Sequence, residues 1–100
     1  ILDPAVPIVT QGPMHVIPDF IVEVKSPDDT YEDMREKARF YVERGVRLVW
    51  LVFPRTRIVE VYRPGVPSEM LGIDDVLDGY DVLPGFSLPV ARLFVTTRGG

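Results

Sequence analysis

The sequence contains no cysteine, which excludes disulfide bonds and any metal site built on thiolates. It also lacks an apolar run of the roughly 18 residues that a membrane-spanning helix needs, so we expect no membrane partner. The first residues do not show the charged leader and following apolar stretch that are typical of a signal peptide. The sequence starts at Ile1, without a methionine. Together these absences favour a cytoplasmic protein.

Positive charge is also in short supply. The chain holds 11 lysine and arginine residues against 15 acidic residues, which gives a formal net charge of −4. Proteins that bind nucleic acid usually carry a basic patch, because much of their affinity comes from neutralised phosphates. One group of cations lies close together in sequence and could form such a patch: Arg35, Lys37, Arg39, Arg44 and Arg47. The simpler interpretation is that these residues form the solvated surface of a helix.

A length of 100 residues supports one domain, 1–100, with one modest core. Residues 1–18 contain several prolines, and we expect them to be largely irregular. His15 lies in this segment without a visible partner and is expected at the surface.

The middle of the chain predicts a strand, a helix and a second strand in succession. Residues 19–25 are rich in β-branched and aromatic side chains, as strands are. The helix should run from about Tyr31 to Arg44, with Gly45 as its left-handed C-terminal residue. Residues 47–53 contain six successive apolar residues, which indicates a strand covered on both faces. This βαβ unit predicts two parallel strands.

The remaining third of the chain predicts shorter elements. Residues 58–62 should return as an antiparallel strand in a hairpin. Residues 68–71 are a candidate for a further strand, and 90–94 for a short helical turn. Glycines and prolines elsewhere in the tail indicate packed loops rather than long elements. The predicted fold class is therefore α/β, with a mixed sheet built on a βαβ unit and a hairpin C-terminal to it.

The first strand carries the candidate chemistry. Alternation places Asp19, Ile21, Glu23 and Lys25 on one face, with Glu23 and Lys25 roughly 6.7 Å apart along an extended strand. A carboxylate at that spacing can hold Mg²⁺ while the lysine steadies or deprotonates an attacking water, or screens a phosphate. The alternative is a partly exposed ion pair at the end of a strand, and the triplet alone does not decide between the two.

The surroundings of this triplet resemble a known family. Residues 17–27 are similar to the signature strand of the bacterial Uma-two family, within the PD-(D/E)XK superfamily of restriction endonucleases. The similarity continues in order through 31–37, Tyr41, 45–52, 58–64 and 78–86. It implies a restriction-endonuclease-like fold and a DNA endonuclease that uses Mg²⁺, or Mn²⁺ in its place.

Carried over by position, the resemblance implies roles for four residues. Glu23 corresponds to the acidic metal ligand of the half-motif, and Lys25 to its lysine. Lys37 and Tyr41 fall on one side of the following helix, where related nucleases often have a polar residue and a tyrosine, and they could hold the scissile phosphate. The alternatives are a surface lysine with its charge in water and a tyrosine of the core.

The chain departs from the family pattern upstream of this strand. The family's first acidic ligand comes from an earlier strand, in its own Pro-Asp pair, and no such strand is visible before Asp19. Asp19 is at most a weak or indirect metal candidate: it lies roughly 13 Å from Glu23 along an extended strand, whereas two ligands of one Mg²⁺ ion lie within about 4 Å. We therefore expect the chain to lack the family's N-terminal strands. Either the missing piece or a partner subunit would cover the exposed sheet edge, and a homodimer is the expected assembly.

Two classes of function remain open. The first is a Mg²⁺-dependent DNA endonuclease domain that hydrolyses phosphodiester bonds. The second is a catalytically inactive nuclease-like domain that serves binding or dimerisation. Glu23 and Lys25 favour the first class, whereas the negative net charge and the missing ligand strand favour the second.

Overall fold

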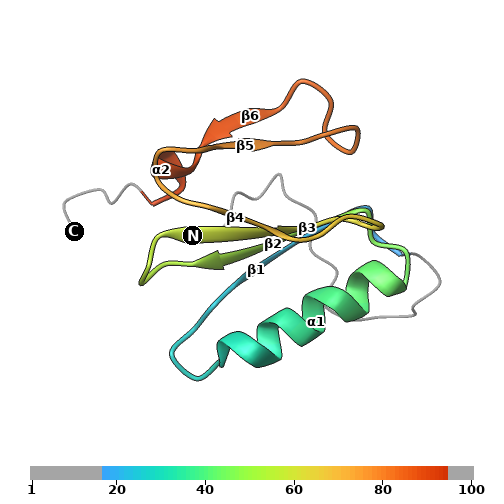
Figure 1. The fold of residues 1–100 in the computed structure, drawn as a ribbon, viewed down its shortest axis with the longest axis horizontal. Coiled ribbons are helices and arrows are strands. Elements are labelled where there is room, and N and C mark those ends of the chain that lie inside the picture. The colour runs from blue at the N-terminus through green and yellow to red at the C-terminus, as the bar shows by residue number, and fades with distance from the viewer. Residues whose placement is uncertain (1–16, 95–100) are drawn as a thin grey trace.

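The computed structural model describes residues 17–94, in which a helix and a small second sheet pack on opposite sides of a four-stranded sheet (Figure 1). His15 and most of the segment expected to be irregular lie outside this range. No helix within it is long and apolar enough to cross a membrane. The elements are β1 (Phe20–Val24), α1 (Tyr31–Glu43), β2 (Leu48–Phe53), β3 (Ile58–Tyr62), β4 (Glu69–Leu71), β5 (Val76–Asp78), β6 (Ser87–Pro89) and α2 (Val90–Leu93).

The main sheet confirms the predicted βαβ unit and hairpin. Its strand order is β1-β2-β3-β4, with β1 and β2 parallel and the other two pairings antiparallel. α1 begins after Thr30, whose hydroxyl oxygen accepts a hydrogen bond from the backbone N–H of Asp33 at 3.0 Å. The turn after α1 contains Gly45 at φ 110°, a conformation that favours glycine.

Every residue of β2 is buried, which explains its uninterrupted apolar run. One apolar cluster lies on the α1 side of the sheet, and the other lies against β5, β6 and α2. The buried members of the cluster on the α1 side are Ile21, Met34, Ala38, Val46, Val49, Leu51 and Phe53. Those of the other cluster are Phe20, Val22, Leu48, Trp50, Val52, Val59, Val61, Leu77 and Val90.

The tail differs from the loops that the sequence predicts. β4 and α2 lie close to their expected positions, but β5 and β6 form an additional antiparallel hairpin. The chain turns between them at Gly79, where a Cβ atom would collide with the backbone oxygen of Leu83. Each of the two strands has three residues, too few for an alternating pattern to stand out. The hairpin nevertheless matters, because Leu77 of β5 is fully buried against the main sheet.

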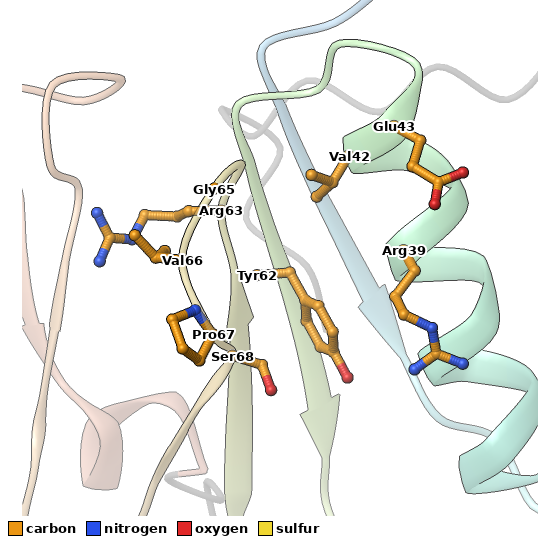
Figure 2. A pocket seen from close by; sticks show the side chains of 9 residues that line it. All are labelled: Arg39, Val42, Glu43, Tyr62, Arg63, Gly65, Val66, Pro67 and Ser68. Atoms are coloured by element: carbon orange, nitrogen blue, oxygen red, sulfur yellow. The ribbon is translucent and has the colours of Figure 1, made fainter.

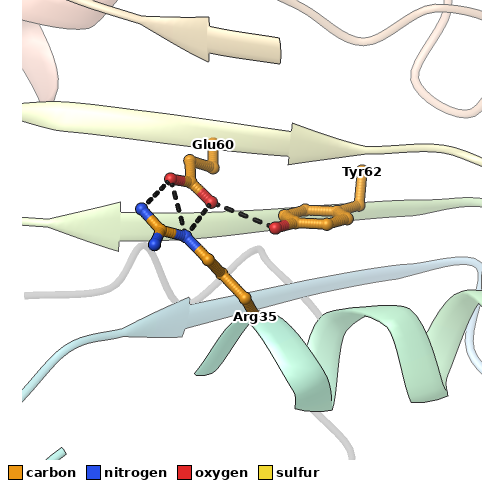
Figure 3. A network of polar contacts seen from close by, with 3 residues as sticks. All are labelled: Arg35, Glu60 and Tyr62. Carbon is orange, nitrogen blue, oxygen red and sulfur yellow. Dashed lines mark hydrogen bonds and ion pairs between the residues drawn. The ribbon is translucent and has the colours of Figure 1, made fainter. Parts of the chain in front are cut away.

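A buried carboxylate lies under α1, and the sequence analysis did not predict it. Glu60 of β3 accepts hydrogen bonds from Nε of Arg35 at 3.0 Å to each oxygen and from Nη2 at 2.6 Å (Figure 3). The hydroxyl of Tyr62 donates a further bond at 3.1 Å. A buried charge is costly unless it is paired, so this network ties α1 to the centre of the sheet.

We expect the substitution Arg35→Met to lower the free energy of unfolding by about 3 kcal/mol, because it leaves the Glu60 carboxylate buried without its cation. Urea denaturation would show this as a lower midpoint with an unchanged slope. The control Arg39→Met, at an exposed position one helical turn away, should change stability by less than about 0.5 kcal/mol. Equal losses in the two variants would contradict the role given to Arg35.

Candidate functional site

Glu23 lies on the face of β1 that points toward α1. Its neighbours Phe20 and Val22 join the apolar cluster on the opposite face, while Ile21 joins the cluster under the helix. The alternation predicted for this strand is therefore present. The Glu23 side chain retains 29% exposure, so its carboxylate reaches water at the margin of the helix.

Two side chains of α1 contact this carboxylate. The hydroxyl of Tyr41 donates a hydrogen bond to Oε2 of Glu23 at 3.1 Å, and Nζ of Lys37 lies 3.8 Å from Oε1. Lys37 and Tyr41 are four residues apart, so both point from the same side of the helix. The structure thus brings three of the predicted site residues together, and we call Glu23, Lys37 and Tyr41 the Glu23 cluster.

The Tyr41 hydroxyl is perturbed by its position in this cluster. Burial, followed by the charge of Glu23 and the hydrogen bond to it, raises the pKa of Tyr41 to about 12. Near neutral pH the hydroxyl therefore keeps its proton. Tyr41 can donate a hydrogen bond to a negative oxygen but cannot act as a base there.

Lys25 lies close to the Glu23 cluster but outside it. Its Nζ donates a hydrogen bond to the backbone oxygen of Ser26 at 3.3 Å and lies 4.9 Å from the centre of the Tyr31 ring. Within residues 17–94, the ion pair of Glu23 is made with Lys37 and not with Lys25. Lys25 follows the last residue of β1, so the two residues of the half-motif lie near each other in the chain but form no ion pair within residues 17–94.

Asp19 lies at the start of β1, apart from the Glu23 cluster. Its Oδ1 is 3.7 Å from Nη1 of Arg47, whose Nη2 is 3.2 Å from Oδ2 of Asp81. The structure therefore places Asp19 in an exposed ion-pair network and not beside Glu23.

The five cations around α1 do not form one patch. Arg35 turns inward to Glu60, and Lys37 pairs with Glu23. Arg44 lies over the ring of Phe40, 4.5 Å from its centre. Arg47 pairs with carboxylates beyond the helix. Three of the five cations, Arg35, Lys37 and Arg47, therefore have acidic partners within residues 17–94.

Glu23 and Glu60 lie in one row across the sheet, on either side of Leu51. Each carboxylate meets a cation from α1 and a tyrosine hydroxyl. The Glu60 side chain is only 4% exposed and accepts four hydrogen bonds, whereas Glu23 is more exposed and accepts one. Glu60 is thus saturated by the protein, and Glu23 still has oxygen lone pairs available to a ligand.

The exposed carboxylate of Glu23 fits one position in the coordination shell of Mg²⁺. This ion is commonly held by one or two carboxylates, with waters and substrate phosphates completing its octahedron. Within residues 17–94, no three His, Cys, Asp or Glu side chains gather where they could share an ion. The described residues therefore do not form a complete protein cage for the ion.

A hollow of about 360 Å³ lies on the other side of α1, between the helix and the loop that joins β3 to β4 (Figure 2). Arg39 and Glu43 of α1 line it together with Tyr62 and the loop. It contains none of the predicted site residues. Its charged lining residues are Arg39, Arg63 and Glu43.

Comparisons with known proteins agree with this architecture. The model of a family described as "Putative restriction endonuclease" (Uma2) matches residues 3–91. A crystal structure of a putative nuclease belonging to DUF820, from Anabaena variabilis, is similar with a TM-score of 0.70 and 25% sequence identity over 76% of this chain. The present chain spans 43% of that solved chain, and no curated protein matches it. The expected mixed α/β nuclease fold is thereby confirmed.

We expect Glu23→Gln to lower the pKa of Tyr41 from about 12 toward its ordinary value, but not fully, because burial remains its largest cause. A pH titration followed by NMR at the ¹³Cζ atoms reads each tyrosine separately. Glu36→Gln, at an exposed site on the same helix, is the matched control and should leave Tyr41 unchanged. An unaltered Tyr41 pKa in the Glu23 variant would show that the two side chains do not interact.

Proposed function

Because the chain belongs to the Uma2 family of putative restriction endonucleases, we propose that it carries half of the active site of a Mg²⁺-dependent DNA endonuclease. The observation that carries this proposal is the contrast between the two carboxylates under α1. Glu60 is buried and saturated, whereas Glu23 is partly exposed in the same row and lies at the acidic position of the half-motif.

In this proposal Glu23 holds the metal through its exposed carboxylate. When bound, Mg²⁺ supplies Lewis-acid polarisation of the phosphodiester and lowers the pKa of a bound water. Tyr41 has a single proton, which it donates to Glu23, so we assign it the task of orienting the carboxylate. This differs from the phosphate contact that the resemblance implied for Tyr41.

The two lysines complete the proposed half-site. Lys37 has three N–H donors and only a 3.8 Å ion pair to Glu23, so it has donors left for a phosphate oxygen. Lys25 lies two residues after Glu23, just beyond the end of β1, where the chain continues into a loop. From there its ammonium group can position the attacking water.

The family description supports DNA as the substrate of this proposal. A homodimer and a cytoplasmic location remain predictions from the sequence. Asp19 remains at most an indirect contributor, since its carboxylate pairs with Arg47.

A nuclease-like domain without catalysis is the second candidate. It is favoured by the ion pair with Lys37, which offsets the charge of Glu23, and by the absence of any group of three metal-ligating side chains within residues 17–94. In this case the Glu23 cluster fastens α1 to β1 and the domain serves binding or dimerisation.

Cleavage of plasmid DNA separates the two candidates. We expect the protein at its full natural length to nick plasmid in Mg²⁺ or Mn²⁺, and Glu23→Ala to slow this at least about 100-fold through loss of a metal ligand. Glu36→Ala, which removes an exposed carboxylate from α1, is the matched control and should cleave normally.

Two outcomes would count against the catalytic role. Equal cleavage by the Glu23→Ala variant and the unsubstituted protein would remove Glu23 from the mechanism. No cleavage by the unsubstituted protein in either metal would support the non-catalytic domain instead.

A further inference from the structure

A second hollow, of about 350 Å³, lies beside the Glu23 cluster, where β1 and β2 both end. Because these strands are parallel and in register, the loop after β1 and the turn after β2 leave the sheet at the same end (Figure 1). The loop contributes Lys25 and Pro27, and the turn contributes Pro54 and Arg55. The hollow therefore adjoins the half-motif without including Glu23.

The base of this hollow is aromatic. Tyr31, the first residue of α1, and Phe53, the last residue of β2, pack edge to face with their ring centres 4.9 Å apart. Phe53 is buried, and Tyr31 is only half-buried, so part of Tyr31 remains accessible. Pro27 and Pro54 add further apolar surface. The two ring planes lie at 71° to each other, so together with the prolines they form an angled apolar wall that can contact part of a nucleobase.

Two cations stand at the rim of the hollow. Lys25 lies over the Tyr31 ring, and Arg55 is exposed on the turn. Among the ion pairs formed within residues 17–94, none involves Lys25 or Arg55. They differ in this from Arg35, Lys37 and Arg47, whose charges are paired. In a protein of net charge −4, these two cations are therefore available to an anionic ligand.

One acid of the neighbouring loop, Asp29, lies within electrostatic range of Lys25 but forms no ion pair with it within residues 17–94. Asp29 accepts hydrogen bonds from the backbone N–H and the hydroxyl of Ser26 at 2.8 and 2.9 Å. These bonds lower the pKa of Asp29 and hold its carboxylate to its own loop. Asp28 is exposed and does not line the hollow.

We propose that this hollow is a nucleotide subsite, in which Arg55 binds a phosphate and the surface around Tyr31 contacts an unpaired base. It rests on the proposed DNA substrate: a strand with its scissile phosphate at Glu23 would place a neighbouring nucleotide over the hollow. Arg55 is then a substrate-binding residue that lies outside the half-motif. Cations combined with an aromatic surface are the usual means of holding single-stranded nucleic acid.

The test is an NMR titration of the 100-residue chain with deoxyadenosine monophosphate, without any metal. We expect saturable shifts of the backbone amides in residues 25–27 and 53–55. Arg55→Ala should weaken this binding about fivefold or more through loss of a charge-assisted phosphate contact. Arg92→Ala, an exposed arginine of α2 on the far side of the sheet, is the matched control and should bind normally.

Two comparison ligands make the result decisive. Deoxyadenosine tests the base alone and inorganic phosphate tests the charge alone, and each should bind more weakly than the nucleotide. Equal affinity for inorganic phosphate and nucleotide, shifts confined to other surfaces, or unchanged binding by Arg55→Ala would overturn the proposal. Because this titration needs neither metal nor cleavage, its failure and a failure of the plasmid assay are distinguishable.

Discussion

Helix α1 covers a sheet face that carries two carboxylates in one row, and the packing of the whole domain depends on how these charges are paired. A carboxylate under a helix is costly unless donors from the helix or sheet reach it. Arg35 reaches Glu60 on β3, while Lys37 and Tyr41 reach Glu23 on β1. These three helix residues lie within two turns, so one placement of α1 fixes both contacts. The opposite face of the sheet packs against the second sheet through mainly apolar side chains, among them Trp50, whose indole N–H is buried without a hydrogen-bond partner.

The two carboxylates have similar partners, and exposure gives them different roles. Glu60 accepts several short hydrogen bonds and is shielded from water, so its pairing serves to link α1 to the sheet. Around Glu23 the contacts are fewer and one side is open, which leaves capacity for a ligand. The cations near α1 also differ in how far they are paired, and most of them already have a partner within the protein. Lys25 and Arg55, at the end of β1 and β2, remain for a polyanion.

The predictable parts of this fold are those with long local patterns. The buried run of β2, the amphipathic helix and Gly45 each follow from neighbouring residues, and so does the face on which Glu23 lies. The pairing of Arg35 with Glu60 could not be predicted in this way. A single Glu in an alternating strand is typical of a solvated face, and its partner lies 25 residues earlier on a helix that looked like a charged surface. The contact of Lys25 with Tyr31, and not with Glu23, likewise depends on where the helix starts. β5 and β6 could not be predicted because a strand of three residues is too short to show an alternating pattern. The turn between them and the buried side chain of Leu77 hold these strands in place.

The central claim is that Glu23, and not Glu60, is the carboxylate available to a divalent cation. Anomalous diffraction from crystals soaked in Mn²⁺ tests it most directly, because the anomalous signal locates the ion without reference to activity. We expect a peak at bonding distance from a Glu23 carboxylate oxygen, with Lys37 displaced from its present contact and the Arg35–Glu60 pair intact. A crystal that binds Mn²⁺ at Glu60 or at other carboxylates, with the Glu23 cluster unchanged and free of the ion, would contradict it.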